Sequence, residues 1–166
     1  MAADMFLKLE GPTVNGESAD SKHPDLIELS SFSWGVANHG TAGTGGGGGS
    51  GAAEKSDFTV SKMTDKASNV LMVACAAGHH YTKATIYCRK AGGEQLDFLT
   101  IELAPSEKGA VFLSNYQIGG GDGGIPTETV SINFSTLNMI YNQQAKEGTG
   151  AGAAPLGWDF SKKAKL

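Results

Sequence analysis

The chain has 166 residues, of which 24 are glycine, and its formal net charge is −4. Of these glycines, 17 lie in three clusters, at 40–51, 119–124 and 148–157. The lack of a G-X-Y period excludes a collagen-like fibre, and the acidic balance without a basic patch argues against nucleic-acid binding. A chain of this length is expected to form a single domain, here residues 1–166.

The beginning of the chain indicates a cytoplasmic protein. The sequence MAADMFLKLEG lacks the basic and apolar regions of a secretion signal. No apolar stretch approaches the roughly 18 residues of a membrane-spanning helix, so we expect no membrane insertion. Cys75 and Cys88 are expected to be reduced thiols.

Most of the chain alternates apolar and polar residues with period two, which predicts β-strands. The phase of this alternation changes at Ser30–Ser31, which predicts a β-bulge, and again near Ser135–Thr136, which predicts a bulge or bend. The glycine cluster at 148–157 is interpreted as a slack connection before the last strand. The predicted strands are 5–10, 27–36, 57–63, 82–89, 97–103, 111–118, 128–141 and 158–160.

The stretch 67–77 predicts one helix. Thr64 or Asp65 can cap its beginning, and Gly78 can end it. Four apolar residues recur at helical spacing and are predicted to face the core: Val70, Val73, Ala74 and Ala77. Because positions 71, 72 and 75 are also apolar, we expect a neighbouring subunit to help cover this helix.

Together these elements favour a mainly β protein with about seven or eight strands and one flanking α-helix. Either a closed barrel or a two-sheet sandwich satisfies this pattern, because both arrangements protect strand edges.

Three motifs resemble ligand sites, and each departs from its pattern. In the phosphate-loop-like segment 47–56, Glu54 replaces the glycine that should precede Lys55, and a strand follows. The glycines of 119–124 fit a dinucleotide fingerprint but also precede a strand. His79 and His80 have no partners at metal-ligand spacing. We therefore predict no catalytic, metal or cofactor site and a protein that is not an enzyme.

Nine stretches spread along the chain carry a resemblance to one family. They are DMFLKLEG at 4–11, SFSWGVANHG at 31–40, GGGGGSG at 45–51, DFTVSKMTDKAS at 57–68, VLMVACAAGHH at 70–80, ATIYCRKAGG at 84–93, FLTIEL at 98–103, ETVSINF at 128–134 and GWDFSKKAKL at 157–166. In this order they resemble the haemolysin-coregulated protein (Hcp) family, the tube protein of bacterial type VI secretion.

The resemblance implies a small closed β-barrel of two sheets and a homohexameric ring with a central channel. It also implies that rings stack into a tube, which a contractile sheath expels with a VgrG-type spike protein at its tip. Effector proteins can be carried or chaperoned in the channel. Such a subunit assembles in the bacterial cytoplasm and reaches the extracellular space or a target cell without a signal peptide.

The resemblance also implies where subunits meet. The family's glycine-rich loop reaches neighbouring subunits and corresponds here to an extended loop at about 37–56, while the helix would lie on the outer side of the ring. On this basis the subunit interface is assigned to Trp34, Val36, His39, Gly40, Gly45, Gly46, Gly47, Gly48, Gly49 and Lys55.

Two other functions remain open at this point. A monomeric β-barrel that binds a carbohydrate or peptide is the main alternative, because ring closure is not encoded in composition. A small hydrolase is disfavoured by the missing catalytic constellation. The oligomeric state separates the tube subunit from the monomeric binding module.

Overall fold

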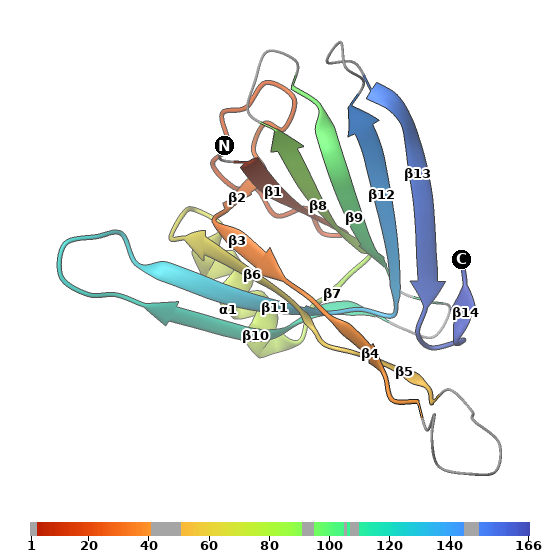
Figure 1. Cartoon of the computed structure of the whole chain (residues 1–166). Helices are drawn as coiled ribbons and strands as arrows, with labels where there is room; N and C mark the ends of the chain where they lie inside the picture. Colours follow the sequence, from red (N-terminus) through yellow and green to blue (C-terminus); the bar gives the residue numbers. More distant parts are fainter. Residues whose placement is uncertain (1–2, 41–50, 91–94, 105, 107–109, 145–149) are drawn as a thin grey trace.

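The computed structural model describes residues 3–40, 51–90, 95–104, 106, 110–144 and 150–166. Within these residues the chain forms fourteen strands and one helix (Figure 1). The strands make a seven-stranded sheet, a five-stranded sheet and a two-stranded hairpin. The mainly β fold with one helix is as predicted. The strand count is higher because four short strands, at 36–38, 53–55, 80–81 and 164–165, gave no separate alternation signal, and because two of the predicted strands are each divided in two.

The seven-stranded sheet has the order β14-β13-β12-β9-β8-β1-β2, and its paired neighbours are antiparallel. It therefore ends in β2 on one side and β14 on the other. Its strands are β1 (Ala3–Glu10), β2 (Ile27–Leu29), β8 (Lys83–Lys90), β9 (Asp97–Ala104), β12 (Thr136–Gln144), β13 (Gly150–Asp159) and β14 (Ala164–Lys165).

The five-stranded sheet has the order β3-β6-β11-β10-β7 and is also antiparallel. Its strands are β3 (Ser31–Ser33), β6 (Phe58–Met63), β7 (His80–Tyr81), β10 (Val111–Gly119) and β11 (Thr127–Asn133). The hairpin of β4 (Val36–Asn38) and β5 (Ala53–Lys55) continues from β3 and β6 and projects away from the two sheets (Figure 1).

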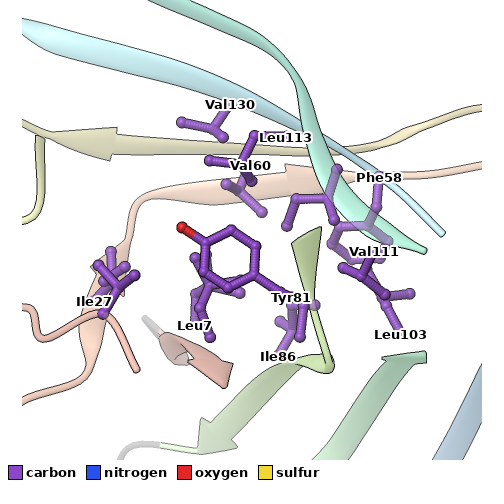
Figure 2. Packing of buried hydrophobic residues seen from close by; sticks show 14 of the residues in the cluster. Leu7, Ile27, Phe58, Val60, Tyr81, Ile86, Leu103, Val111, Leu113 and Val130 are labelled. Carbon is purple, nitrogen blue, oxygen red and sulfur yellow. The ribbon is translucent and has the colours of Figure 1, made fainter. Parts of the chain in front are cut away.

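One hydrophobic core lies between the two sheets (Figure 2). Leu7 and Ile86 come from the seven-stranded sheet, whereas Phe58, Val60 and Val130 come from the five-stranded sheet, and all five are 0% exposed. Burial of such side chains is the main force that holds sheet against sheet.

The closed barrel implied by the resemblance is not formed. In the part of the chain that the structure describes, no strand of one sheet is hydrogen-bonded in register to a strand of the other. The chain passes between the sheets from β2 to β3 and from β11 to β12, but these crossings are bends of one strand rather than strand pairs. Each sheet therefore keeps two edges.

The first of these crossings also corrects the predicted bulge at Ser30–Ser31. The phase of the alternation changes there because the chain leaves one sheet and enters the other, which reverses the side of the strand that faces the shared core. Leu29 is buried in the first sheet, and Phe32 packs against the core from the second. The same event, a bend after Asn133, divides the predicted long strand 128–141 into β11 and β12.

The helix α1 (Ser68–Ala77) lies where the sequence predicts, but it turns a different face to the core. Gly78 ends it in the left-handed conformation, with φ of 65°. Of the four residues predicted to face inward only Ala74 is buried, together with Leu71, while Val73 is 49% exposed. Nearly every position of this helix is apolar, so spacing alone selects no single face. The residue at the helix N-cap is Ala67, with no side-chain cap; the Asp65 carboxylate accepts a hydrogen bond from its N–H (2.9 Å).

The predicted slack connection at 148–157 is wrong from Gly150 onward, because these residues belong to β13. Glycine and alanine carry little strand signal, yet the strand pairs with β12 along its length. On its other side β14 pairs only with Trp158 and Asp159. Most of β13 is therefore a sheet edge, the position in which a strand tolerates a residue such as Pro155.

Candidate subunit interface

Trp34 connects β3 to β4 and is fixed by its own chain. Its indole Nε1 donates a hydrogen bond to the carbonyl oxygen of Ser56 (3.0 Å), and its ring lies 6.2 Å from that of Phe134 and 6.1 Å from that of Phe160. Edge-on and tilted contacts of this kind stabilise aromatic clusters. Trp34 is only half-buried, so one part of its ring holds the hairpin base and another faces outward.

The remaining predicted interface residues follow along the hairpin. Val36 opposes Lys55 in the β4–β5 register and is 52% exposed. The His39 imidazole lies 3.8 Å from the Glu54 carboxylate, with both side chains about three-quarters exposed (76% and 77%). Gly40 is exposed and has no atom within 4 Å of an added Cβ. Gly45, Gly46, Gly47, Gly48 and Gly49 lie outside the described residues.

Lys55 turns its side chain toward the aromatic cluster. Its Nζ lies 4.3 Å from the ring centre of Phe134 and 5.9 Å from that of Phe160, a cation–π arrangement. Burial lowers the pKa of Lys55, and the charge of Asp57 opposes this effect. The ammonium group is therefore partly removed from water at the hairpin base.

A groove of about 500 Å³ lies between this hairpin and the end of the seven-stranded sheet. Its walls are almost entirely apolar. The lining residues are Trp34, Val36, Ala53, Leu137, Leu156, Gly157, Trp158, Phe160 and Lys165. Trp34 and Val36 were predicted as interface residues, but Leu156 was not. Leu156 and Trp158 are two positions apart, which is the spacing of side chains on one face of a strand.

The groove belongs to a larger uncovered face. In the register of the sheet, Ile101 on β9 is paired with Met139 on β12, which is paired with Leu156 on β13. All three side chains therefore point to the core side, yet their exposed fractions rise from 2% to 38% to 61%. The core face of the seven-stranded sheet thus continues beyond the five-stranded sheet, and Trp158 (38% exposed) extends it to the groove.

A buried cluster of charges beside the helix N-terminus was not predicted. The Lys62 ammonium group is 0% exposed and lies 2.5 Å from Glu128 Oε2 and 2.9 Å from Asp65 Oδ1. Ser68 donates a hydrogen bond to Glu128 (2.8 Å), and the Tyr116 hydroxyl donates another. Burial alone would raise the pKa of Glu128, but these hydrogen bonds outweigh it and lower that pKa. Burial and the bond to Glu128 raise the pKa of Tyr116 to about 12.

A second charged cluster lies on the outer face of the seven-stranded sheet. Arg89, 1% exposed, contacts Asp20 (2.5 Å) and Asp97 (3.4 Å), and the His23 ring lies 3.0 Å from Asp97. These pairs attach the segment before β2 to β8 and β9. The arrangement is that of a structural network, since each acid is paired with the Arg89 cation.

Other chemistry is limited in the part of the chain that the structure describes. No group of three or more His, Cys, Asp or Glu side chains there is arranged to hold a metal ion. No described helix is long and apolar enough to cross a membrane. Cys75 and Cys88 are free thiols, and burial, with the nearby charge of Asp97, raises the pKa of Cys88 to about 11.

The chain is thus a two-sheet β protein with a projecting hairpin and an uncovered apolar face, and comparison with known proteins identifies its family. Residues 6–141 match the model of the type VI secretion system effector Hcp. The chain is 36% identical to "Protein hcp1" of Pseudomonas aeruginosa over 163 residues, which cover 96% of each chain. The chain therefore belongs to the Hcp family.

Solved structures agree with this assignment. A structure described as that of a type six secretion system protein superposes with a TM-score of 0.90 at 30% identity, covering 99% of this chain and 100% of the other. The crystal structure of Hcp1 from Salmonella typhimurium gives 0.80 at 29% identity, with full coverage of both chains. Members of this family are secreted proteins that form the type VI secretion tube, and this chain is a structural subunit of that tube.

Proposed function

We propose that six copies of this chain form a closed ring and that the rings stack into the secretion tube. The observation that carries this proposal is the uncovered core-side face of β12 and β13. Large apolar side chains that form a continuous surface on one copy mark a place where another protein surface packs. In a ring of identical copies, the same contact is repeated at every boundary.

The contact between copies is proposed to include the hairpin and the groove beside it. Trp34 and Val36 line the groove. Lys55 is paired with Val36 in the hairpin, and His39 and Gly40 lie further along it. The projection of β4 and β5 beyond the two sheets supports this assignment, because it brings these residues within reach of a neighbour (Figure 1). The segment Gly45–Gly49, between these strands in the sequence, is proposed to contribute to stacking between rings.

The further partners follow from the tube role. We propose that the tube is assembled in the bacterial cytoplasm, meets a VgrG-type spike protein at its tip, and is expelled by a contractile sheath. Effector proteins are proposed to travel in its channel. A structural role of this kind requires no catalytic group in the subunit.

Native mass spectrometry with electron microscopy of the purified protein tests the ring. We expect a six-copy species and six-fold rings. We expect Val36→Asp to reduce the ring population by at least roughly tenfold, because a buried charge at an interface is costly. Val73→Asp is compared with it, because this valine is similarly exposed (49% against 52%) and lies on α1, the helix that the sequence predicts a neighbouring subunit to cover.

Val36 is preferred to Trp34 for this test because Trp34→Asp also breaks the aromatic cluster within one copy. Trp34→Asp is expected to lose both folding and ring formation. A protein that remains monomeric at every concentration tested would refute the ring and favour the monomeric ligand-binding module. Loss of rings in Val73→Asp but not in Val36→Asp would place the interface on the helix instead.

A further inference from the structure

The groove at one end of the seven-stranded sheet combines apolar walls with positive charge. Leu156 and Trp158 are exposed in it, and Lys165 lines its rim. Lys163 lines an adjoining hollow of about 420 Å³ that shares Trp158. Neither lysine has a carboxylate within 4.0 Å among the described residues. We call Leu156, Trp158, Lys163 and Lys165 the basic end.

The opposite end of the same sheet carries the complementary pattern. A hollow of about 220 Å³ beside β2 is lined by Glu17, Glu28 and Asp65 around the side chain of Met63. Met63 is 55% exposed, and Glu28 is exposed on the edge strand. Asp65 is already paired with Lys62, so it is left out of the set. We call Glu17, Glu28 and Met63 the acidic end.

The surroundings of the acidic end leave it negative. Lys66 lies nearby, but its ammonium group faces Asp25 (3.8 Å), and only its backbone N–H is directed to Glu17 (3.3 Å). Glu28 also lines a neighbouring hollow with Asp4 and Asp20, of which Asp20 is held by Arg89. Glu28 has no ion-pair partner among the described residues, so its charge is available to another molecule.

We propose that the basic end of one copy receives the acidic end of the next, with Met63 in the groove and Glu17 and Glu28 facing Lys163 and Lys165. This inference rests on the proposed ring. The two ends lie at opposite edges of the sheet (Figure 1), so one copy cannot use both on a single partner. The contact is head-to-tail, and repetition of such a contact closes a ring when the rotation between successive copies adds up to a full turn. Charges of this kind set the register of a contact and suppress wrong pairings.

Charge exchange tests the pairing directly. The first variant, Lys163→Glu with Lys165→Glu, has two acidic ends, and the second, Glu17→Lys with Glu28→Lys, has two basic ends. Each alone is expected to lose ring formation by on the order of tenfold or more, because like charges face each other at every boundary. An equimolar mixture is expected to restore rings in which the two variants alternate, which an even number of copies permits.

Native mass spectrometry reads the outcome, because alternating rings contain equal numbers of the two variants. Lys8→Glu with Lys90→Glu is the control, since it gives the first variant's net charge at sites outside both ends. Ring yield should also fall with added salt, since screening weakens exposed pairs. Glu17, Glu28, Lys163 and Lys165 are all exposed, so the thermal midpoint of the monomer should not change in either charge-exchange variant.

The result separates this contact from the ring itself. Rings that survive both variants, or that are lost in each and not restored by mixing, would overturn the proposed pairing while the unmodified protein still forms rings. Absence of rings in the unmodified protein would overturn the proposed function and this contact with it.

Discussion

Two parts of the seven-stranded sheet have the same alternation of side chains but different surroundings. In its middle, on β8 and β9, Ile86 and Leu103 are 0% exposed beneath the five-stranded sheet. At the β12–β13 end, Met139 and Leu156 point to the same side and are 38% and 61% exposed. Alternation therefore identifies the apolar side of a strand, but the second layer that covers it is a property of the whole fold.

The largest expected effect compares the same substitution in the covered middle of the sheet and at its β12–β13 end. Leu103→Ala leaves a cavity in the core and is expected to lower the free energy of unfolding by about 3 kcal/mol. Leu156→Ala removes an exposed side chain and is expected to cost less than about 1 kcal/mol in the monomer, but to weaken rings. Urea unfolding at concentrations at which gel filtration shows monomer measures the first effect, and native mass spectrometry the second.

Equal destabilisation of the monomer by the two alanine variants would mean that the β12–β13 end is covered within a single copy. That result would remove the reason for regarding this face as an interface. Rings unaffected by Leu156→Ala would instead restrict the interface to the hairpin.

The five-stranded sheet, which covers Ile86 and Leu103, is itself held together by the buried Lys62–Glu128 pair. Breaking this pair should therefore destabilise the monomer without affecting the β12–β13 face. Glu128→Gln leaves Asp65 as the one acid paired with Lys62 in this cluster. We expect it to lower the free energy of unfolding by about 2 kcal/mol. Glu102→Gln is the control, because its pair with Lys83 is partly exposed and should contribute less than about 1 kcal/mol. Chemical unfolding measures both variants, and rings should persist in native mass spectra.

The same pair predicts sensitivity to acid. Because the pKa of Glu128 in the folded protein lies below its ordinary value of 4.5, its stabilisation is complete above that value and is lost as pH falls below it. Glu128→Gln should therefore have a flatter stability profile than the unmodified protein in this acidic range. Identical profiles would contradict a stabilising charge at Glu128.

The smallest expected effect concerns the Asp20–Arg89 pair on the outer face of the seven-stranded sheet. The hydrogen bond from Arg89 is the main reason that the pKa of Asp20 is lowered to about 2 from 3.8. The stabilisation that the ionised Asp20 carboxylate gives the fold should be present above pH 3.8 and disappear as pH falls toward 2. Asp20→Asn should lose this dependence, whereas Asp4→Asn, at an exposed acid, should keep it; urea midpoints measured across this pH range compare them. A dependence retained in Asp20→Asn would assign it to other carboxylates.

The sequence predicted the elements whose signal is local. Alternation located β1, β6, β8, β9 and β10, and Gly78 marked the end of the helix. The face of α1 was not predictable by spacing because positions 70–77 are apolar almost all round. The sheet crossing at Ser30 looked like a bulge because both events reverse the phase of the alternation, and only the partner strands distinguish them.

The candidate site divides in the same way. The resemblance led to the hairpin with Trp34 and Val36. The other wall of the groove lies more than a hundred residues away in β13, where glycine weakens the alternation that would predict a strand. Lys62 and Glu128 share the phase of Val60 and Val130, which is a signal that could have placed them on the core side. What it could not show is that two charged residues 66 positions apart meet, since pairing across the sheet is set by tertiary structure.

The proline in β13 has a consequence for how a free subunit survives before assembly. A long open strand edge with an apolar neighbour such as Leu156 is a template on which other chains add strands and aggregate. Pro155 lacks the N–H that a regular ladder requires, so an added strand would be interrupted in the middle of this edge. The chain can thus expose the apolar face that we propose as a contact between copies, while the backbone of this edge resists uncontrolled addition of strands.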